Sequence, residues 1–337
     1  MSRGPCAPLR GCADLLACPV SSAPLIAVAG GFATADGARH YPVVDGIGRF
    51  FVPTDRQRGA GDVTDLVKAF YEETPFPNYA AGETRATLAA KAQANHFLRA
   101  LDDAVPADAV VLEAGCGTGQ LSNFLGLSEG RRVLGGDICW NSLRLAEGFR
   151  ERESIAGAAF VQMNLFRPPL RDASVDLVIA NGVLHHTGDA RAGFEALLRI
   201  VKPGGVVLLG LYNRYARLAT LARRKVFAHF GTRAHFLDRR LGRGQDTPQR
   251  QAWFRDQYRH PHETRHSIGE VLCWFDESGV DFLGSLPRSD GAPIAAASLF
   301  APQARRTPAR YLALELGLLL RGGRDGGLFI LLGRKRG

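Results

Sequence analysis

A turn with three glycines at alternate positions constrains the fold of this chain more than any other feature. It spans residues 113–120 (EAGCGTGQ) and follows an apolar run at 110–112. Glycines accept positive φ angles and let the backbone approach a ligand without a Cβ in the way. A helix that begins after such a turn presents free N–H groups, which favour an anionic ligand. The sequence therefore predicts a buried strand, a ligand-binding turn and then a helix.

The spacing of these glycines differs from that of a dinucleotide-binding turn. The pattern Gly-x-Gly-x-x-Gly would need its last glycine at position 120, where this chain has Gln120. An acidic residue, Glu113, also lies two positions before the first glycine, Gly115. Both details argue against a nicotinamide dinucleotide, although an NAD-dependent oxidoreductase built on the same turn stays the remote alternative.

Strand-like and helix-like segments alternate along the second two thirds of the chain. Helix-compatible segments at 141–150 and 189–201 separate several apolar runs. The expected strands are 110–113, 132–137, 160–163, 176–180, 206–211, 280–286 and 327–333. Because this alternation is typical of parallel strands joined by crossover helices, we predict an α/β fold with a doubly wound, Rossmann-like sheet of seven strands. Insertions are expected after strands five and six, at 213–265 and 288–325.

Polar residues follow the ends of these strands, at the edge where such sheets bind ligands. Asp137 ends the second strand. A carboxylate there can accept hydrogen bonds from both ribose hydroxyls of an adenosine ligand. Asn164 and Leu165 follow the third strand, where adenine would lie, and Asn181 follows the fourth. We therefore expect a nucleoside-containing ligand along this edge.

Residues 106–212 resemble the class I S-adenosylmethionine (SAM)-dependent methyltransferases, especially the group that contains the ubiquinone and menaquinone C-methyltransferases. The matching stretches are 111–119 (VLEAGCGTG), 136–138 (GDI), 176–179 (DLVI), 183–186 (VLHH) and 198–205 (LRIVKPGG). The resemblance implies SAM as the cofactor and methyl transfer as the activity. It implies cofactor contacts by Glu113, Gly115, Cys116, Gly117, Gly119, Asp137, Ile138, Asn164, Leu165 and Asn181. The family usually has an acid near adenine, and the amide of Asn164 can still bond adenine N6.

A second, smaller resemblance lies in residues 1–55. The stretches 16–19 (LACP) and 41–47 (YPVVDGI) resemble a small zinc-ribbon-related module that activates some methyltransferases. Zinc needs a Cys-x-x-Cys knuckle and usually four ligands. Ser21 stands where the partner of Cys18 would be, so we expect a small ribbon-like module without metal.

Residues 56–105 are expected to form a helical cap in front of the methyltransferase domain. Apolar residues at helical spacing predict helices at 64–73 and 84–101. The SAM-dependent methyltransferase domain is then expected to span residues 106–337.

Residues 262–266 (HETRH) form a His-Glu-x-x-His pattern, which holds zinc when it lies on a helix. Here Ser267 and Glu270 predict a capping box, so the helix begins after the motif and no metal site is expected. The substrate candidates follow strands four and five or lie in the 213–265 insertion: His185, His186, Tyr212, Asn213, Tyr258, His260 and His262. Imidazole titrates near neutrality, so histidines among them could act as a base. A base is needed only if the acceptor must lose a proton, and the catalytic residue stays unassigned.

The formal net charge is +9, and much of it lies in residues 214–243, which hold nine Lys or Arg residues against Asp238 alone. Such a segment suits RNA, an anionic membrane or an acidic substrate, and equally a solvated face without a partner. Its helical phase gives no clean membrane-binding face, because Leu218 and Leu221 lie in or beside the basic arc.

The acceptor of the methyl group is not fixed by these motifs. Insertions that carry aromatic residues favour a small molecule, and the basic segment 214–243 keeps tRNA or rRNA as the alternative. A SAM-binding protein without enzymatic activity is a third reading.

We find no apolar stretch of about 20 residues that could span a membrane, no secretory signal core and no paired spacing among the cysteines. A cytoplasmic protein is therefore expected.

Overall fold

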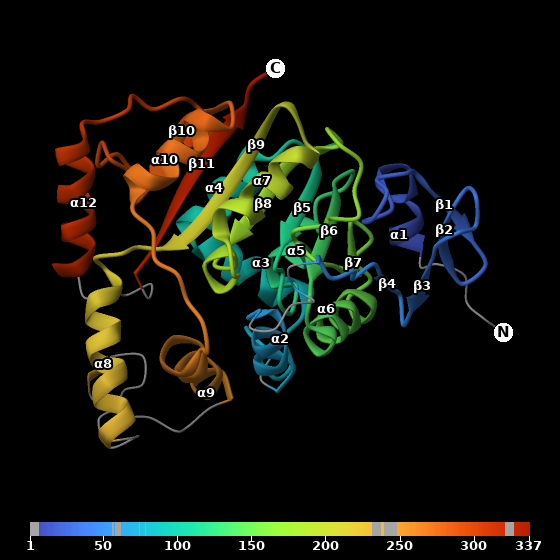
Figure 1. Cartoon of the computed structure of the whole chain (residues 1–337), viewed down its shortest axis with the longest axis horizontal. Helices are drawn as coiled ribbons and strands as arrows, with labels where there is room; N and C mark the ends of the chain where they lie inside the picture. Colours follow the sequence, from blue (N-terminus) through green and yellow to red (C-terminus); the bar gives the residue numbers. More distant parts are fainter. Residues whose placement is uncertain are drawn as a thin grey trace.

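The computed structural model describes residues 7–55, 57, 62–73, 75–77, 79–230, 237–238, 248–320 and 327–337. Within them one sheet has eleven strands, in the order β1-β2-β3-β4-β7-β6-β5-β8-β9-β11-β10 (Figure 1). The strands are β1 (Leu25–Val28), β2 (Gly31–Thr34), β3 (His40–Val44), β4 (Ile47–Arg49), β5 (Val110–Ala114), β6 (Arg132–Asp137), β7 (Ala158–Gln162), β8 (Val175–Asn181), β9 (Val201–Tyr212), β10 (Val280–Leu286) and β11 (Leu328–Lys335).

The predicted α/β fold is confirmed, and the count of seven strands for the sheet is wrong. The seven expected strands are all present, as β5 to β11. The strands from β7 to β9 pair in parallel, and β11 and β10 add to β9 in antiparallel fashion. Four N-terminal strands extend this sheet, because β4 pairs in parallel with β7. The sequence analysis treated those four strands as a separate module.

The central strands are apolar throughout because helices cover both faces of the sheet. All five residues of β5 are buried. Val110 and Leu112 enter one hydrophobic core, and Val111, which points to the opposite face, enters a second. Two cores on opposite faces of one sheet are the arrangement expected of a doubly wound fold.

The helices on the faces and edges of the sheet are α1 (Ala7–Arg10), α2 (Thr64–Glu73), α3 (Arg85–Ala94), α4 (His96–Ala104), α5 (Gln120–Leu125), α6 (Trp140–Arg152), α7 (Ala190–Ile200), α8 (Arg217–Phe230), α9 (Pro248–Phe254), α10 (Ile268–Glu277), α11 (Ala296–Leu299) and α12 (Pro308–Leu320). Short 3-10 turns lie at Ala13–Leu15 and Leu184–His186, and a π-helical turn at Arg255–Arg259. The helix expected at 64–73 is confirmed as α2.

The single helix expected at 84–101 is instead two helices, α3 and α4. Asn95 separates them with an extended ψ of 113°, and its side-chain oxygen accepts hydrogen bonds from the N–H groups of Phe97 and Leu98. An asparagine that caps the next helix in this way favours a break in the chain over continued helix. By contrast, the capping box expected at Ser267 and Glu270 is confirmed at the start of α10.

In Figure 1, α2 and α9 lie at the lower edge of the view, beyond the carboxyl ends of the parallel strands, and α8 and α12 form a column along one side of the molecule. In the part of the chain that the structure describes, no helix has the length and apolar character needed to cross a bilayer.

Candidate active site

A cavity of about 340 Å³ lies at the carboxyl ends of the parallel strands. Its wall includes the glycine turn after β5, Asp137 at the end of β6 and Asn181 at the end of β8. Residues of the helical cap and of the 213–265 insertion complete the wall. This edge is where open α/β sheets bind their ligands.

The glycine turn brings bare backbone to the cavity. Gly115 and Gly117 both line it and have φ angles of +74° and +52°. A Cβ on Gly117 would overlap the carbonyl oxygen of Phe76, and a Cβ on Gly115 would overlap the side chain of Val183. These two positions therefore require glycine both for backbone conformation and for space.

Gly119 is placed differently from the other two glycines. It is not among the described residues that line the cavity. A Cβ on it would come within 2.6 Å of the side chains of Ala146 and Phe160. Gly119 is therefore needed for close packing of the start of α5 against α6 and β7, and it is not part of the described cavity wall.

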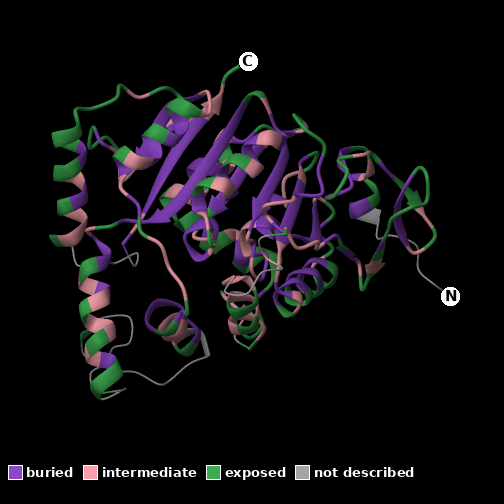
Figure 2. Cartoon of the chain, viewed as in Figure 1, coloured by how far each residue is buried: buried purple, intermediate pink, exposed green. Residues whose placement is uncertain are grey.

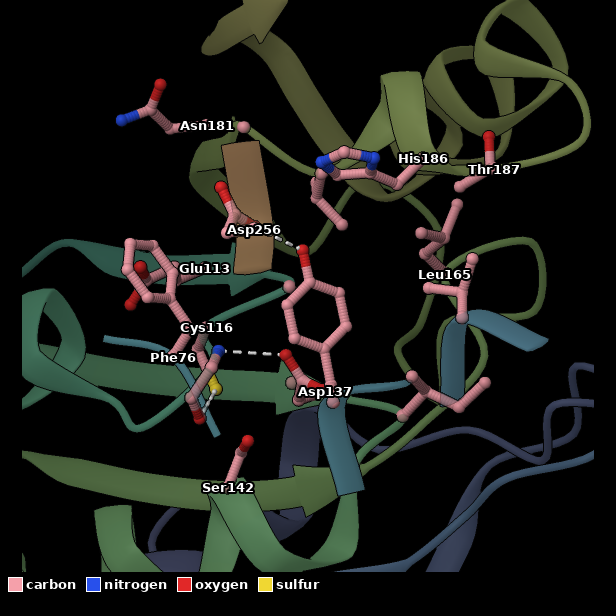
Figure 3. Close-up of a pocket in the computed structure, with 18 of the residues that line it drawn as sticks. Phe76, Glu113, Cys116, Asp137, Ser142, Leu165, Asn181, His186, Thr187 and Asp256 are labelled. Atoms are coloured by element: carbon pink, nitrogen blue, oxygen red, sulfur yellow. Dashed lines mark hydrogen bonds between the residues drawn. The ribbon is translucent and has the colours of Figure 1, made fainter. Parts of the chain in front are cut away.

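Asp137 is held by the glycine turn. Its Oδ2 accepts a hydrogen bond of 2.8 Å from the N–H of Gly117 (Figure 3). Its Oδ1 accepts one of 2.8 Å from the N–H of Cys139. These bonds fix the orientation of the carboxyl group at the cavity wall and leave lone pairs for a ligand. Burial raises the pKa of Asp137 above its usual range.

Glu113 is the second acidic group of this wall. Ser122 on α5 donates a hydrogen bond of 2.5 Å to its Oε2. Burial raises the pKa of Glu113 to about 8; the hydrogen bonds from Ser122 oppose this shift and the neighbouring Asp137 adds a smaller rise. A cationic ligand beside these two carboxyl groups would favour their ionised forms.

Asn164 and Leu165 line the cavity as expected, together with Ile138. The amide Nδ2 of Asn164 already donates to the carbonyl oxygen of Val52 at 2.9 Å and to Gln57 Oε1 at 2.5 Å. Its Oδ1 accepts from the N–H of Phe166 at 3.1 Å, which leaves one lone pair for an amino group such as adenine N6.

Cys116 and Asn181 also line the cavity. The thiol of Cys116 is buried, and burial raises its pKa. Asn181 is exposed at the rim, and Figure 3 shows its amide directed away from the other labelled side chains. Of the cofactor residues expected from the sequence, all but Gly119 therefore meet at one cavity.

The cavity is also lined by a group of hydrogen-bonded polar side chains, of which the sequence analysis named only Tyr212. The hydroxyl of Tyr71 on α2 donates a hydrogen bond of 2.8 Å to Asp256 Oδ1. Gln257 Nε2 donates to Asp256 Oδ2 and to the hydroxyl of Tyr212, both at 2.8 Å. All four of these residues line the cavity. Burial raises the pKa of Asp256 above its usual range.

A buried arginine supports this group from behind. Arg217 has no exposed surface and donates to Gln257 Oε1 at 2.6 Å. Its guanidinium lies 3.8 Å from the ring centre of Tyr212 and pairs with Glu263. The position of Gln257, and through it that of Asp256, is therefore fixed by helix α8.

A sequence signal for these residues existed. Asp256 and Gln257 are two polar residues within an aromatic segment, between Trp253-Phe254 and Tyr258. The π-helical turn at Arg255–Arg259, which turns both of them inward, has no comparable signal. Single π-helical turns often occur at functional sites.

Three of the histidines expected near the acceptor, His185, His186 and His260, are buried. His186 lines the cavity and stacks on His260 with a ring distance of 3.6 Å, and its Nδ1 lies 2.9 Å from the carbonyl oxygen of His262. Burial lowers the pKa of both His186 and His260 to about 3. His185 is fully buried against Tyr212, and burial lowers its pKa as well. Buried imidazoles resist protonation, so the pKa of each of these three histidines lies below the near-neutral value of a free imidazole.

Of the seven substrate candidates, His186 and Tyr212 line the cavity, and the other five are not among its described lining residues. Asn213 is buried and donates to Glu315 at 2.8 Å. The hydroxyl of Tyr258 donates to Asp238 at 2.5 Å. His262 Nε2 lies 3.1 Å from the carbonyl oxygen of Thr187. These residues have packing or hydrogen-bonding roles in the insertion.

The expectation that 262–266 (HETRH) precedes a helix is confirmed, because Ser267 caps α10 immediately after it. His266 Nδ1 lies 2.8 Å from Glu270, and His262 turns to Thr187 instead. Glu263, between them, pairs with Arg217. Among the described residues, no group of His, Cys, Asp and Glu is arranged to hold a metal ion.

Comparison with known proteins agrees with this geometry. Residues 112–209 match a family model described as a methyltransferase domain. An uncharacterised protein of Synechococcus is 27% identical over 207 residues, which cover 54% of this chain and 50% of that protein. A tRNA (carboxymethyluridine(34)-5-O)-methyltransferase of Arabidopsis thaliana is 32% identical over 113 residues, which cover 33% of this chain and 26% of that protein. A malonyl-acyl-carrier-protein O-methyltransferase of Yersinia pestis is 32% identical over 99 residues, or 29% of this chain and 35% of that protein.

The chain spans half or less of the length of these curated relatives. Among solved structures, a complex of the Haloferax volcanii Trm112 methyltransferase activator with a methyltransferase aligns with a TM-score of 0.46 and 18% identity, over 75% of this chain and 94% of that chain. The glycine turn, the two carboxyl groups beside it and the family match fall on the same stretch of sequence. Residues 112–209 of this chain therefore form a methyltransferase domain, and SAM is the cofactor that the match supports.

Proposed function

We propose that this protein transfers the methyl group of SAM to a small molecule held beside Tyr71, Asp256 and His186. The observation that carries this proposal is that one cavity of about 340 Å³ is lined both by the glycine turn and by these polar side chains. Small-molecule sites are typically concave pockets of about 300–1,000 Å³ with a few convergent polar groups. A donor and an acceptor would meet in this cavity.

The residues around the glycine turn fit SAM. Gly115 and Gly117 leave the backbone bare where a Cβ would overlap neighbouring atoms. Glu113 and Asp137 place two carboxyl groups beside that backbone. Carboxylates accept hydrogen bonds from an ammonium group and from ribose hydroxyls, both of which SAM carries. Asn164, Leu165 and Ile138 would hold its adenine.

SAM supplies an already activated methyl group when it is bound. The protein then has to orient the acceptor and exclude water. Tyr71 and Phe76 from the cap and Trp253 from the insertion cover the cavity and would exclude water. The Asp256 carboxyl group, joined to Tyr71 by a hydrogen bond, is placed to orient an acceptor N–H or O–H and to take its proton.

The charge of the lining favours a neutral or cationic acceptor. Its ionisable groups include the carboxyl groups of Glu113, Asp137 and Asp256, and none of the described lining residues is Lys or Arg. An acceptor with a negative group, such as the malonyl or carboxymethyl groups in the names of the relatives, would find no cationic side chain among the described lining residues. We therefore propose an acceptor amine or hydroxyl without a nearby acidic group.

RNA is the second candidate acceptor. Helix α8 carries Arg223, Arg224 and Lys225 and has no acidic residue, which suits a phosphate backbone, and one relative acts on tRNA by name. RNA binding would weaken steeply with salt, and the enclosed small-molecule site would not.

We also propose the division of the chain into a β module (1–55), a helical cap (56–105) and a methyltransferase domain (106–337) with insertions at 213–265 and 288–325. The contribution of α2 and of the π-helical turn to the cavity wall supports cap and insertion as the acceptor-side elements.

The test is methyl transfer from SAM labelled on its methyl group, with a fractionated cell extract as the source of acceptors. We expect label in the small-molecule fraction with the wild type and none with Asp137→Ala. Glu129→Ala, which removes an exposed acid away from the cavity, is the control and should behave as the wild type. Label in RNA would favour the second candidate. Thermal stabilisation by NAD but not by SAM or S-adenosylhomocysteine would overturn the assignment.

A further inference from the structure

Helix α12 turns its one acidic residue inward and three of its leucines outward. Glu315 is 3% exposed and accepts hydrogen bonds of 2.8 Å from Asn213 Nδ2 and from the N–H of Ile268. Leu312, Leu316 and Leu320 are 42%, 42% and 85% exposed. Their spacing of four residues places all three on one side of the helix. The outer side of α12 is therefore apolar, which is the reverse of an ordinary surface helix.

Helix α8 adds two further exposed apolar side chains. Leu218 and Phe230 on α8 are 49% and 63% exposed. The two helices contact each other and form one column at the edge of the molecule (Figure 1), and Figure 2 shows exposed residues along both. We call the exposed side chains of Leu218, Phe230, Leu312, Leu316 and Leu320 the α8–α12 face.

The exposed charges on helices α8 and α12, and just before α12, are basic. Residues 213–237 contain no Asp or Glu, and residues 291–324 contain only Glu315, which is buried. Lys225 on α8 is exposed, and so are Arg306 and Arg310 at the start of α12. Exposed leucine and phenylalanine with lysine and arginine, and without carboxylates, are the combination found on helices that lie in the surface of anionic membranes.

We propose that the α8–α12 face docks this protein onto an anionic membrane surface. The leucines would enter the boundary between headgroups and acyl chains, and Lys225, Arg306 and Arg310 would contact anionic headgroups. A second copy of the chain fits less well, because a twofold interface would bring the same cations together. RNA would use the cations but not the leucines. The inference does not depend on which acceptor the cavity takes.

Vesicle flotation with the full chain tests this proposal. We expect binding to vesicles of phosphatidylcholine with phosphatidylglycerol, little binding to phosphatidylcholine alone, and weaker binding at high salt. The double variant Leu312→Gln/Leu316→Gln should lower the partition into anionic vesicles by about tenfold or more. Lys225→Ala/Arg310→Ala should lower it as well.

Leu145→Gln is the matched control, because Leu145 is 44% exposed but lies on α6. It should bind vesicles as the wild type does. Circular dichroism and S-adenosylhomocysteine affinity should be unchanged in all variants, which separates a lost surface from a lost fold. Equal binding by wild type and the double leucine variant would overturn the proposal. So would a wild-type dimer that the leucine substitutions convert to a monomer, since a second copy would then cover the face.

Discussion

The hydroxyl of Tyr71 donates a hydrogen bond of 2.8 Å to Asp256, across 185 positions of sequence. The bond joins α2 of the cap to the π-helical turn of the insertion. It places a buried carboxyl group in the wall of the cavity that the glycine turn also lines. The cap, which precedes the methyltransferase domain, and the insertion, which lies within it, thus meet at the site.

Replacing this carboxyl group tests its role in methyl transfer. We expect Asp256→Asn to lower the rate of methyl transfer by about 10²-fold or more, which is the usual contribution of a positioned proton acceptor. Affinity for S-adenosylhomocysteine should stay within about twofold of the wild-type value, because we place Asp256 beside the acceptor and not beside the cofactor. Labelled-SAM turnover and calorimetry measure the two quantities. Tyr71→Phe, which keeps the ring and removes the hydroxyl, should have a smaller effect on the rate. A loss of cofactor affinity in Asp256→Asn would contradict this division of the cavity.

Gly117 should tolerate no side chain. In Gly117→Ala the new Cβ would overlap the Phe76 carbonyl oxygen and the residue would keep a positive φ, so we expect S-adenosylhomocysteine affinity to fall by about tenfold or more. Gly204→Ala is the control, because Gly204 also has a positive φ, +78°, but open space around it. It should cost about 1 kcal/mol of stability and leave calorimetric affinity unchanged. Equal affinity in both variants would argue against a tight cradle at Gly117.

The raised pKa of Glu113 predicts how stability changes with pH. Its pKa is about 8 in the folded protein against 4.5 as the ordinary value, so the folded state binds the proton more tightly. Its contribution is fully present below pH 4.5 and is lost as the pH rises towards 8. Glu113→Gln keeps an acceptor for Ser122 and cannot ionise. We expect the variant to gain unfolding free energy relative to the wild type as the pH rises, by an amount on the order of a few kcal/mol near pH 8. Denaturant titrations at several pH values measure this difference, and a constant offset would refute it.

The lowered pKa of His186 predicts the opposite change of stability with pH. Its pKa of about 3 in the folded protein lies below the ordinary 6.5, so the unfolded chain binds the proton more tightly. Stability from this group is present above pH 6.5 and is lost as the pH falls towards 3. Relative to His186→Phe, the wild type should lose about 2 kcal/mol of unfolding free energy between roughly pH 7 and pH 5. Chemical denaturation of both proteins at the two pH values is the measurement, and parallel pH dependence would exclude a neutral buried imidazole.

The strands and the cavity residues around the glycine turn could be predicted because their sequence signals are local. The glycine turn, Asp137 and Asn164 each follow an apolar strand, and the sheet brings strand ends together whatever the rest of the chain does. The break at Asn95 was less visible, since apolar residues at helical spacing continue past it and one side-chain hydrogen bond decides the outcome.

The acceptor wall could not be predicted because it depends on tertiary packing. Tyr71 and Asp256 are ordinary polar residues of helical segments until α2 and the π-helical turn are placed against each other. The α8–α12 face was hidden for the same reason: Leu218 alone gave no clean face, and the leucines of α12 lie about a hundred residues further along the chain.

The parallel pairing of β4 with β7 has a consequence for the handling of this protein. Without β4, the main-chain N–H and C=O groups along the outer side of β7 would be free to pair with another molecule. A chain trimmed to begin after residue 55 should therefore self-associate through that edge and precipitate during purification. The N-terminal strands would thus protect the protein from aggregation, and this role requires neither zinc nor contact with the methyl donor.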